Sequence, residues 1–457
     1  MSTNNVINRI TLGLEKITAE SISAEVFNIA KSCIIDTCGV AIAGSTTRSA
    51  RNIHSVVKES FRGGNCTVLG NTNTLNVFGA AVANGASAHA LDFDDNCYAG
   101  IVHGSAVVLP SVLAVAQENS SSGNELLSSF IAGLEAQFAV AKALSNNIYD
   151  RGWWTTSILG VIGSAAGACK LLNLNREATS NALALAIVGG GATRSVRGTD
   201  AKHYYCGLAA ERGITAAKLA LNGATGPLNV FEDLNGITKV LNGDKFERKY
   251  IDMIGKEYCI LKPGMDIKKY PVCYASHAAI DGVKELIDLN NINSFNIKKI
   301  ICTVPPVVAS NLTFPNPVNR TEAQFSLEYA IATIIEHGSL DLTHLEDKFV
   351  KSSRLKRVSE LVYMNVSNLP KEEIDNKFIC PEWAEIEIMT NDGMCYKTFV
   401  GAPVGSANRP LPEKLLYKKF SECLTYAKND TNPKELYERL LNICLLYTSD
   451  AADEEDS

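Results

Sequence analysis

Apolar and polar positions alternate at helical spacing through the first half of the chain. Residues 23–44 and residues 74–93 repeat apolar positions about three to four residues apart, and the first of these runs ends at a glycine. Few strand signals interrupt the pattern before about Gly255. The pattern therefore predicts a series of helices up to that point.

The pattern changes from Ile260, where prolines become frequent and β-branched residues form short runs. Residues 298–309 have the composition of a strand, and helical patterns precede and follow them at residues 278–290 and 325–338. Residues 383–400 predict two strands around Asp392 and Gly393, which is the strongest hairpin signal in the chain. A last helical stretch begins at about Glu413.

These patterns predict a mainly α protein, with a large all-helical domain and a smaller α+β domain. A chain of 457 residues is too long for one compact core and should divide into two or three domains. We expect residues 1–262 to form the helical domain, which residues 405–443 would complete. We expect residues 263–404 to form the α+β domain.

The end of the chain, residues 444–457, differs in character from what precedes it. CLLYTSDAADE does not continue the helical pattern before it and leads into an acidic tail. It also resembles the conceptual translation of a transposase adapter used in DNA library preparation. We therefore expect these residues to be a non-native tail and exclude them from the fold prediction.

Composition and charge narrow the possible partners and compartment. The chain is 46% hydrophobic and 20% charged, and its net charge of -6 offers no overall attraction to nucleic acid or to an anionic membrane. The 13 cysteines are scattered without a CxxC pair, which argues against structural zinc and iron–sulfur clusters. The start, MSTNNVINRI, has no secretory character, and the longest apolar stretch, residues 158–172, is too short to span a bilayer. We expect a cytoplasmic protein with free thiols and neither a nucleic-acid nor a membrane partner.

Residues 89–117 combine charged groups with apolar, helix-competent sequence. Asp92, Asp94, Asp95 and His103 lie between runs of Ala, Val and Leu, where they would be costly to bury without partners. This segment therefore predicts a functional site. His103 is the leading candidate for a general acid or base, because histidine changes charge nearest neutral pH.

Several segments resemble the MmgE/PrpD family, which includes 2-methylcitrate dehydratases, cis-aconitate decarboxylases and iminodisuccinate epimerases. They are, in order, HALDFDDNCYAGIVHGSAVVLP, RGWWTTSILGVIGSAAGACKLL, RGTDAKHYYCGLAAERGITAAKLALNGATGP, IKKYPVCYASHAAIDGV and RTEAQFSLEYAIATIIEHG. The resemblance spans about residues 5 to 410. It implies a large helical domain, a smaller α+β lid domain with the site between them, a homodimer, and catalysis without metal or organic cofactor.

The resemblance also assigns roles to individual residues. It carries catalytic roles to Asp92, His103, Lys202 and His277, and a substrate-binding role to Lys268. Moving a proton beside a carboxylate requires a tuned imidazole or carboxylate, and cations hold the substrate and stabilise the developing charge. We expect His103 to move the proton, Asp92 to orient or charge-stabilise an imidazole, and Lys202, Lys268 and His277 to bind carboxylates.

Other polar residues receive weaker assignments. Arg197 lies close to Lys202 in the chain, and a guanidinium suits carboxylate binding, so we also expect it to bind substrate. Asp94 and Asp95 are expected to cap helices or to form salt bridges, and His89 is expected to be structural.

The chain departs from the family pattern at three expected pocket positions. Trp154 stands where members with dehydratase or decarboxylase activity usually carry histidine, Tyr205 stands where many have another histidine, and Asn96 stands where threonine is frequent. We predict that these three residues contact the substrate and that the substrate differs from that of most members.

The expected function is that of a cofactor-independent lyase acting on a small di- or tricarboxylate, by dehydration or decarboxylation. The first alternative is an isomerase or epimerase of a small dicarboxylate such as iminodisuccinate, because Trp154 would narrow the pocket. The second is a catalytically inactive homologue that binds carboxylates.

Overall fold

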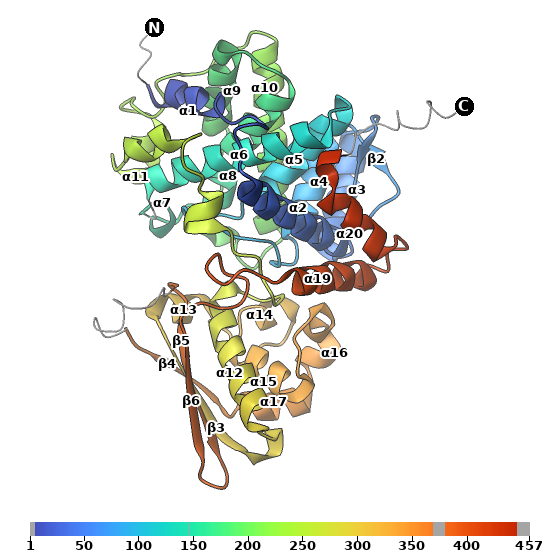
Figure 1. Ribbon diagram of the computed structural model, residues 1–457, viewed down its shortest axis with the longest axis vertical. Helices are drawn as coiled ribbons and strands as arrows, with labels where there is room; N and C mark the ends of the chain where they lie inside the picture. The colour runs from blue at the N-terminus through green and yellow to red at the C-terminus, as the bar shows by residue number, and fades with distance from the viewer. Residues whose placement is uncertain (1–4, 146, 369–379, 446–457) are drawn as a thin grey trace. The chain divides into compact units, whose positions relative to one another are not determined.

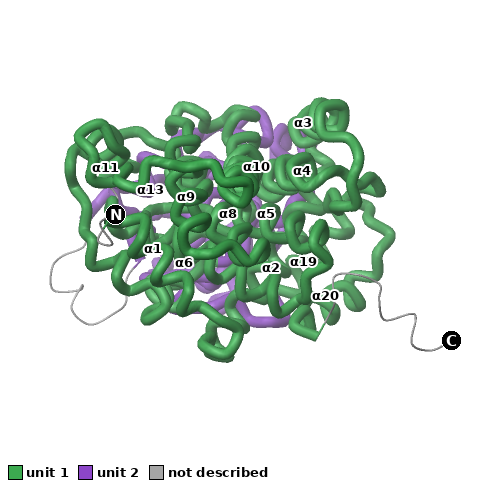
Figure 2. The backbone as a smooth tube through the Cα atoms, turned by 90° about the horizontal axis from the view of Figure 1, so that it is seen from above, with its two compact units in different colours: residues 1–266, 416–457 green, residues 267–415 purple. Residues whose placement is uncertain are grey.

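The computed structural model describes residues 5–145, 147–368 and 380–445, and the chain forms two compact units (Figure 2). Unit 1 comprises residues 1–266 and 416–457, and unit 2 comprises residues 267–415. The boundaries predicted from the sequence were 262/263 and 404/405. Most of the predicted tail, residues 446–457, lies outside the described residues.

Unit 1 is built from helices, in agreement with the predicted fold class (Figure 1). Its main helices are α1 (Val6–Leu14), α2 (Ala24–Gly44), α3 (Arg48–Ser60), α4 (Val77–His89), α5 (Ser105–Glu118), α6 (Gly123–Leu144), α8 (Thr155–Leu171), α9 (Arg176–Val188), α10 (Ala201–Leu221), α19 (Glu413–Tyr426) and α20 (Pro433–Leu441). Two short helices, α7 (Asn147–Asp150) and α11 (Ile237–Asn242), and a two-residue strand pair, β1 (Cys66–Thr67) with β2 (Thr74–Leu75), complete it.

Side-chain caps fix the starts of most of the long helices of unit 1. The Ser23 hydroxyl accepts a hydrogen bond from the backbone of Val26 at the start of α2, and the Asn76 amide does the same for Gly79 in α4. Helix α6 begins with a capping box formed by Ser122 and Glu125. These caps satisfy backbone N–H groups that have no partner inside the helix.

Small residues let the helices that carry the site approach closely. A Cβ atom on Gly85 of α4 would lie 2.8 Å from the Cα atom of Gly207 in α10, so these two backbones are in direct contact. Gly133 of α6 and Gly163 of α8 make a similar contact. Because Gly85 lies about one turn from the end of α4 and Gly207 lies less than two turns from the start of α10, their contact brings these two helix termini near each other.

Two helices of unit 1, α2 and α6, are long and apolar enough to cross a membrane by length and composition. The apolar window of α2 is 72% buried within the protein, and that of α6 is 94% buried. Helices that are apolar on all sides are expected in the core of a large protein as well as in a membrane. The burial of α2 and α6 accounts for their composition as core helices.

Unit 2 contains a four-stranded mixed sheet in the order β4–β3–β5–β6 (Figure 1). Its strands are β3 (Ile297–Val304), β4 (Val362–Val366), β5 (Ala384–Thr390) and β6 (Cys395–Val400). Its helices are α12 (His277–Asn290), α13 (Pro306–Asn311), α14 (Arg320–Ala323), α15 (Leu327–His337), α16 (Asp347–Val350) and α17 (Ser353–Ser359). Alternate residues of β5 are buried, and α12 packs on β5 and β6 to form one hydrophobic core with α15 and α17.

The sheet agrees with the predicted hairpin and differs from the sequence prediction at two places. Strands β5 and β6 pair antiparallel across the turn at Asp392 and Gly393. The strand predicted over residues 298–309 ends at Val304, because Pro305 and Pro306 remove backbone donors and Pro306 starts α13. Strand β4, which pairs parallel with β3, was not predicted.

A buried ion pair ties the last helices of unit 1 to the segment that carries the site. The Lys419 ammonium of α19 lies 2.6 Å from a carboxylate oxygen of Asp36 in α2, and the two side chains are 4% and 0% exposed. The same ammonium donates to the carbonyl oxygen of Phe93 at 2.8 Å and lies 3.8 Å from the centre of the Phe93 ring. Lys419 therefore fixes the backbone between Asp92 and Asp94.

We predict that Lys419→Met lowers the free energy of unfolding by about 3–5 kcal/mol, because it leaves the buried Asp36 carboxylate without its cation. Urea denaturation of the full chain measures the change. Lys418→Met is the matched control, since Lys418 lies next in sequence and pairs at the surface with Glu422 at 3.6 Å. Equal stability of the two variants would contradict the prediction.

Candidate active site

The site in unit 1 is built on the loop between α4 and α5, residues 90–104, which has an unusual backbone. Asp92 has φ +50° and Ile101 has φ +55°, a region that residues other than glycine seldom adopt. The loop is tied to the start of α8, where the Thr155 hydroxyl donates to the Ile101 carbonyl at 2.7 Å and Thr156 accepts from the His103 N–H at 3.1 Å. Strain that is held by such contacts is typical of functional sites.

Asp94 is held between two imidazoles. Its carboxylate oxygens lie 2.8 and 2.9 Å from Nδ1 of His89, and one of them lies 3.1 Å from Nδ1 of His103. The centres of the two imidazole rings are 4.5 Å apart. Asp94 therefore makes the contact with an imidazole that was expected of Asp92. His89, which was expected to be structural, belongs to the same cluster.

The contacts of His103 determine which of its ring nitrogens carries the proton in the neutral ring. Nδ1 faces the Asp94 carboxylate and also the backbone carbonyl of Asp95 at 2.9 Å. A carbonyl oxygen can only accept, so Nδ1 must be the donor. Nε2 of the neutral ring is then the unprotonated nitrogen, which is the arrangement that a general base requires.

Burial controls the charges of the neighbouring groups. Burial lowers the pKa of His89 to about 3, against the opposing effect of Asp94, so this ring is neutral near pH 7. Burial alone would raise the pKa of Asp94, but His89 and His103 lower it well below its ordinary value. Burial raises the pKa of Asp95 to about 7, although the hydroxyl of Ser105 donates to its carboxylate and acts in the other direction.

Lys202 supplies the cation of the site. It lies in the first turn of α10, and its ammonium is 2.6 Å from a carboxylate oxygen of Asp92 and 5.3 Å from the centre of the Trp154 ring. Burial acts to lower the pKa of Lys202, but Asp92 raises it above its ordinary value, so the ammonium stays protonated. The Trp154 ring lies 6.0 Å from that of His103 and 5.8 Å from that of His89, so the structure brings these predicted residues together.

Three helices begin at this cluster, and none of them has a side-chain cap. Helix α5 starts two residues after His103, α8 starts immediately after Trp154, and α10 starts immediately before Lys202. The first N–H groups of a helix lack partners within it and carry partial positive charge. Together with the Lys202 ammonium, these helix starts favour a bound anion such as a carboxylate.

Three more of the predicted residues, Asn96, Arg197 and Tyr205, also lie in unit 1. The Asn96 amide donates to the Asp266 carboxylate at 3.1 Å, and the backbones of the two residues also pair. Arg197 donates to the hydroxyl of Tyr149, and Tyr205 follows Lys202 in α10 with its ring 5.9 Å from that of Tyr204. Their substrate contacts stay predictions.

Two predicted residues, Lys268 and His277, belong to unit 2. His277 is the first residue of α12, and its Nε2 lies 3.4 Å from the carbonyl oxygen of Val272. Its ring is in contact with the rings of Tyr270 and Tyr274, at 5.2 and 5.0 Å between centres. The roles predicted for Lys268 and His277 stay predictions.

His89, Asp94 and His103 also form a possible set of metal ligands. Their ligand atoms lie within 4.8 Å of one another, and two imidazoles with one carboxylate suit a transition metal. To bind a metal through Nδ1, His103 would have to give up its contact with the Asp95 carbonyl, which lies 2.9 Å from that nitrogen. The absence of a metal from this site stays a prediction.

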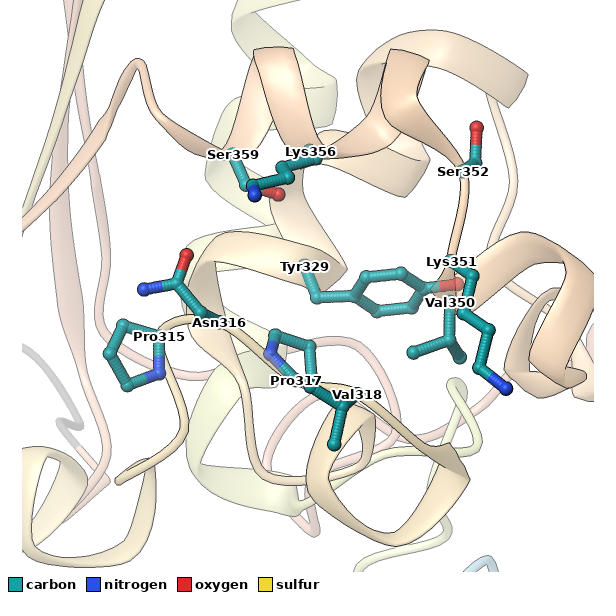
Figure 3. A pocket seen from close by; sticks show the side chains of 10 residues that line it. All are labelled: Pro315, Asn316, Pro317, Val318, Tyr329, Val350, Lys351, Ser352, Lys356 and Ser359. Carbon is teal, nitrogen blue, oxygen red and sulfur yellow. The ribbon is translucent and has the colours of Figure 1, made fainter.

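A separate cavity of about 370 Å³ lies within unit 2 (Figure 3). Its walls combine the Tyr329 ring and Pro317 with the ammonium-bearing chain of Lys356, and its other lining residues are Pro315, Asn316, Val318, Val350, Lys351, Ser352 and Ser359. These lining residues include none of the predicted site residues and no imidazole or carboxylate. The cavity therefore has no counterpart of the imidazoles and the carboxylate that form the cluster around His103.

The fold and the site together define a mainly helical protein with a cluster of two imidazoles and a buried carboxylate beside an ammonium group. Comparison with known families matches residues 9–249 to the MmgE/PrpD N-terminal domain and residues 270–442 to the MmgE/PrpD C-terminal domain. The chain belongs to the MmgE/PrpD family.

The chain is also similar to proteins named cis-aconitate decarboxylase. It is 26% identical to the one from Homo sapiens over 403 residues, which cover 85% of this chain and 82% of the human protein. It is 22% identical to the one from Aspergillus terreus over 462 residues, which cover 96% of this chain and 93% of the fungal protein. The similarity to these relatives is distant but covers most of each chain.

Proposed function

We propose that the protein is a lyase that acts on a small di- or tricarboxylate by proton transfer at a carbon next to a carboxylate. The observation that carries the proposal is His103, whose Nδ1 is engaged by Asp94 and the Asp95 carbonyl so that Nε2 is available. Lys202 lies beside the same cluster and provides a cation for a carboxylate. The relatives named cis-aconitate decarboxylase support a substrate of this class.

The residues of unit 1 suit two related reactions. In a dehydration, Nε2 of His103 takes the proton from carbon, Lys202 stabilises the enolate-like charge, and the C–O bond breaks as His103 delivers the same proton to the leaving hydroxyl, which departs as water. In a decarboxylation, the C–C bond breaks to release carbon dioxide, and protonated His103 delivers a proton to the resulting carbanion. Both reactions need one proton-moving group and one cation.

Trp154 favours a second candidate function. Its indole lies beside His89, His103 and Lys202, where it occupies space that a smaller ring would leave open. A smaller dicarboxylate would suit such a site. Removal of a proton from carbon and its return to the other face would then epimerise or isomerise the substrate without loss of water or carbon dioxide.

The purified full chain, incubated with candidate acids, tests these alternatives. The set is 2-methylcitrate, citrate, cis-aconitate, iminodisuccinate and small dicarboxylates. New double bonds are followed by absorbance, released carbon dioxide is measured, and products are separated on a chiral column. A lyase yields an unsaturated acid or carbon dioxide, an epimerase yields only the other stereoisomer, and binding without turnover would identify an inactive homologue.

We predict that activity survives prolonged treatment with EDTA, because the proposed proton transfer uses the His103 imidazole and the Lys202 ammonium and includes no step that needs a metal ion. The measurement compares kcat before and after the chelator is removed by gel filtration, with metal content determined in parallel. Loss of activity that a divalent ion restores would contradict the prediction.

A further inference from the structure

His89 is a fully buried histidine of unit 1, and only one of its two ring nitrogens has a hydrogen-bond partner among the described residues. Its side chain is 0% exposed, and its Nε2 atom has no hydrogen-bond partner among the described residues. A buried nitrogen without a partner costs free energy that an apolar side chain of similar size would not. Stability alone therefore does not explain a histidine at this position.

The other nitrogen of His89 makes a specific contact. Nδ1 lies 2.9 and 2.8 Å from the two carboxylate oxygens of Asp94, which is also fully buried. Since Asp94 is ionised and its oxygens can only accept, Nδ1 of His89 is the donor. His89 thus restrains both oxygens of the carboxylate that contacts His103.

We propose that His89 is a positioning residue, which holds Asp94 so that Asp94 keeps the proton of His103 on Nδ1 and leaves Nε2 free for the substrate. The functional part of this inference rests on the proposed function, because it assigns proton transfer to His103. His89 itself needs no contact with the substrate. Its effect reaches the reaction through Asp94 and the orientation of the His103 ring, whose centre is 4.5 Å from its own.

The chain offers a conservative replacement for this role. In His89→Asn the side-chain amide can present an N–H at the position of Nδ1 and keep the contact with Asp94, whereas His89→Leu removes that donor. We expect His89→Leu to lower kcat about 10- to 100-fold with little change in KM, because a small misplacement of a catalytic group has effects of this size. We expect His89→Asn to recover most of the lost kcat.

His203→Leu is the matched control for removal of a buried imidazole. His203 lies in α10, is also buried, and likewise has an Nε2 atom without a hydrogen-bond partner among the described residues. Its replacement should affect kcat much less than His89→Leu. Because His89→Leu takes a donor from the buried Asp94 carboxylate, it should melt below the wild-type protein, so kcat is compared at a temperature at which every variant is folded. The inference would be overturned if His89→Leu kept the wild-type kcat. It would also be overturned if folded His89→Asn were as slow as folded His89→Leu.

A measurement without substrate separates this inference from the proposed function. The chain has seven histidines, and labelling them with ¹⁵N allows the protons on their ring nitrogens to be observed by NMR. The wild-type protein should show a protected, downfield Nδ1–H resonance that disappears in His103→Ala. This resonance should broaden or shift in His89→Leu and return in His89→Asn. An unprotonated Nδ1 in His103, or a resonance that His89→Leu leaves unchanged, would overturn the inference whether or not a substrate is found.

Discussion

Replacement of His103 by alanine is expected to lower kcat by about two to four orders of magnitude, the usual contribution of a general acid or base. The physical reason is the fixed tautomer of the ring. Nδ1 faces two acceptors, the Asp94 carboxylate and the Asp95 carbonyl, so the neutral ring presents an unprotonated Nε2. Of the two imidazoles that contact Asp94, only that of His103 is partly exposed, at 13% against 0% for His89.

Steady-state kinetics on the substrate found with the carboxylate set measure this loss. His337→Ala is the control, because it removes a histidine at the end of α15 in unit 2, away from the predicted site residues in sequence. The His103→Ala variant should still bind substrate, since its cation is intact, and added imidazole should restore part of the turnover. Turnover within a few-fold of wild type would remove His103 from the proton-transfer step.

The fold was predictable where one physical signal dominated. Residues 383–400 alternate apolar and polar positions around an Asp–Gly pair, and they form the hairpin of β5 and β6. Strand β4 was missed because Val362–Val366 is a short edge strand with only Val362 buried, so its sequence shows no clear alternation. Its parallel pairing with β3 is a tertiary contact that local periodicity does not reveal.

The sequence pointed to several residues that the structure brings together in the candidate site, but not to the contacts that its three aspartates make. Asp92, Asp94 and Asp95 lie within four residues, and which one faces an imidazole depends on the backbone of the loop. The positive φ of Asp92 reverses the chain direction locally, so that Asp92 contacts Lys202 while Asp94 contacts the histidines. His89 was missed for a similar reason, since its partner lies five residues on, beyond the end of α4.

Replacement of Lys202 by methionine is expected to raise KM about 30-fold or more, the usual effect of truncating one partner of a partly buried, hydrogen-bonded charge pair. Lys202 is 14% exposed and Asp92 is 12% exposed, so water screens the pair only in part. Lys202→Met removes the cation that we propose binds a substrate carboxylate. It also removes the positive charge that offsets the Asp92 carboxylate, which then repels the incoming carboxylate.

These two effects can be separated by a second substitution. The double variant Lys202→Met with Asp92→Asn lacks the cation but no longer presents the repelling anion, so its KM should lie between those of the wild type and Lys202→Met. Lys218→Met is the matched control, because Lys218 lies on the same helix, α10, and pairs with Glu118 nearer the surface. If Lys202 acted only as a structural partner of Asp92, Lys202→Met would lower stability and leave KM unchanged, and the double variant would restore the stability. A rise in KM that Asp92→Asn partly reverses therefore distinguishes a substrate-binding cation from a buried salt bridge.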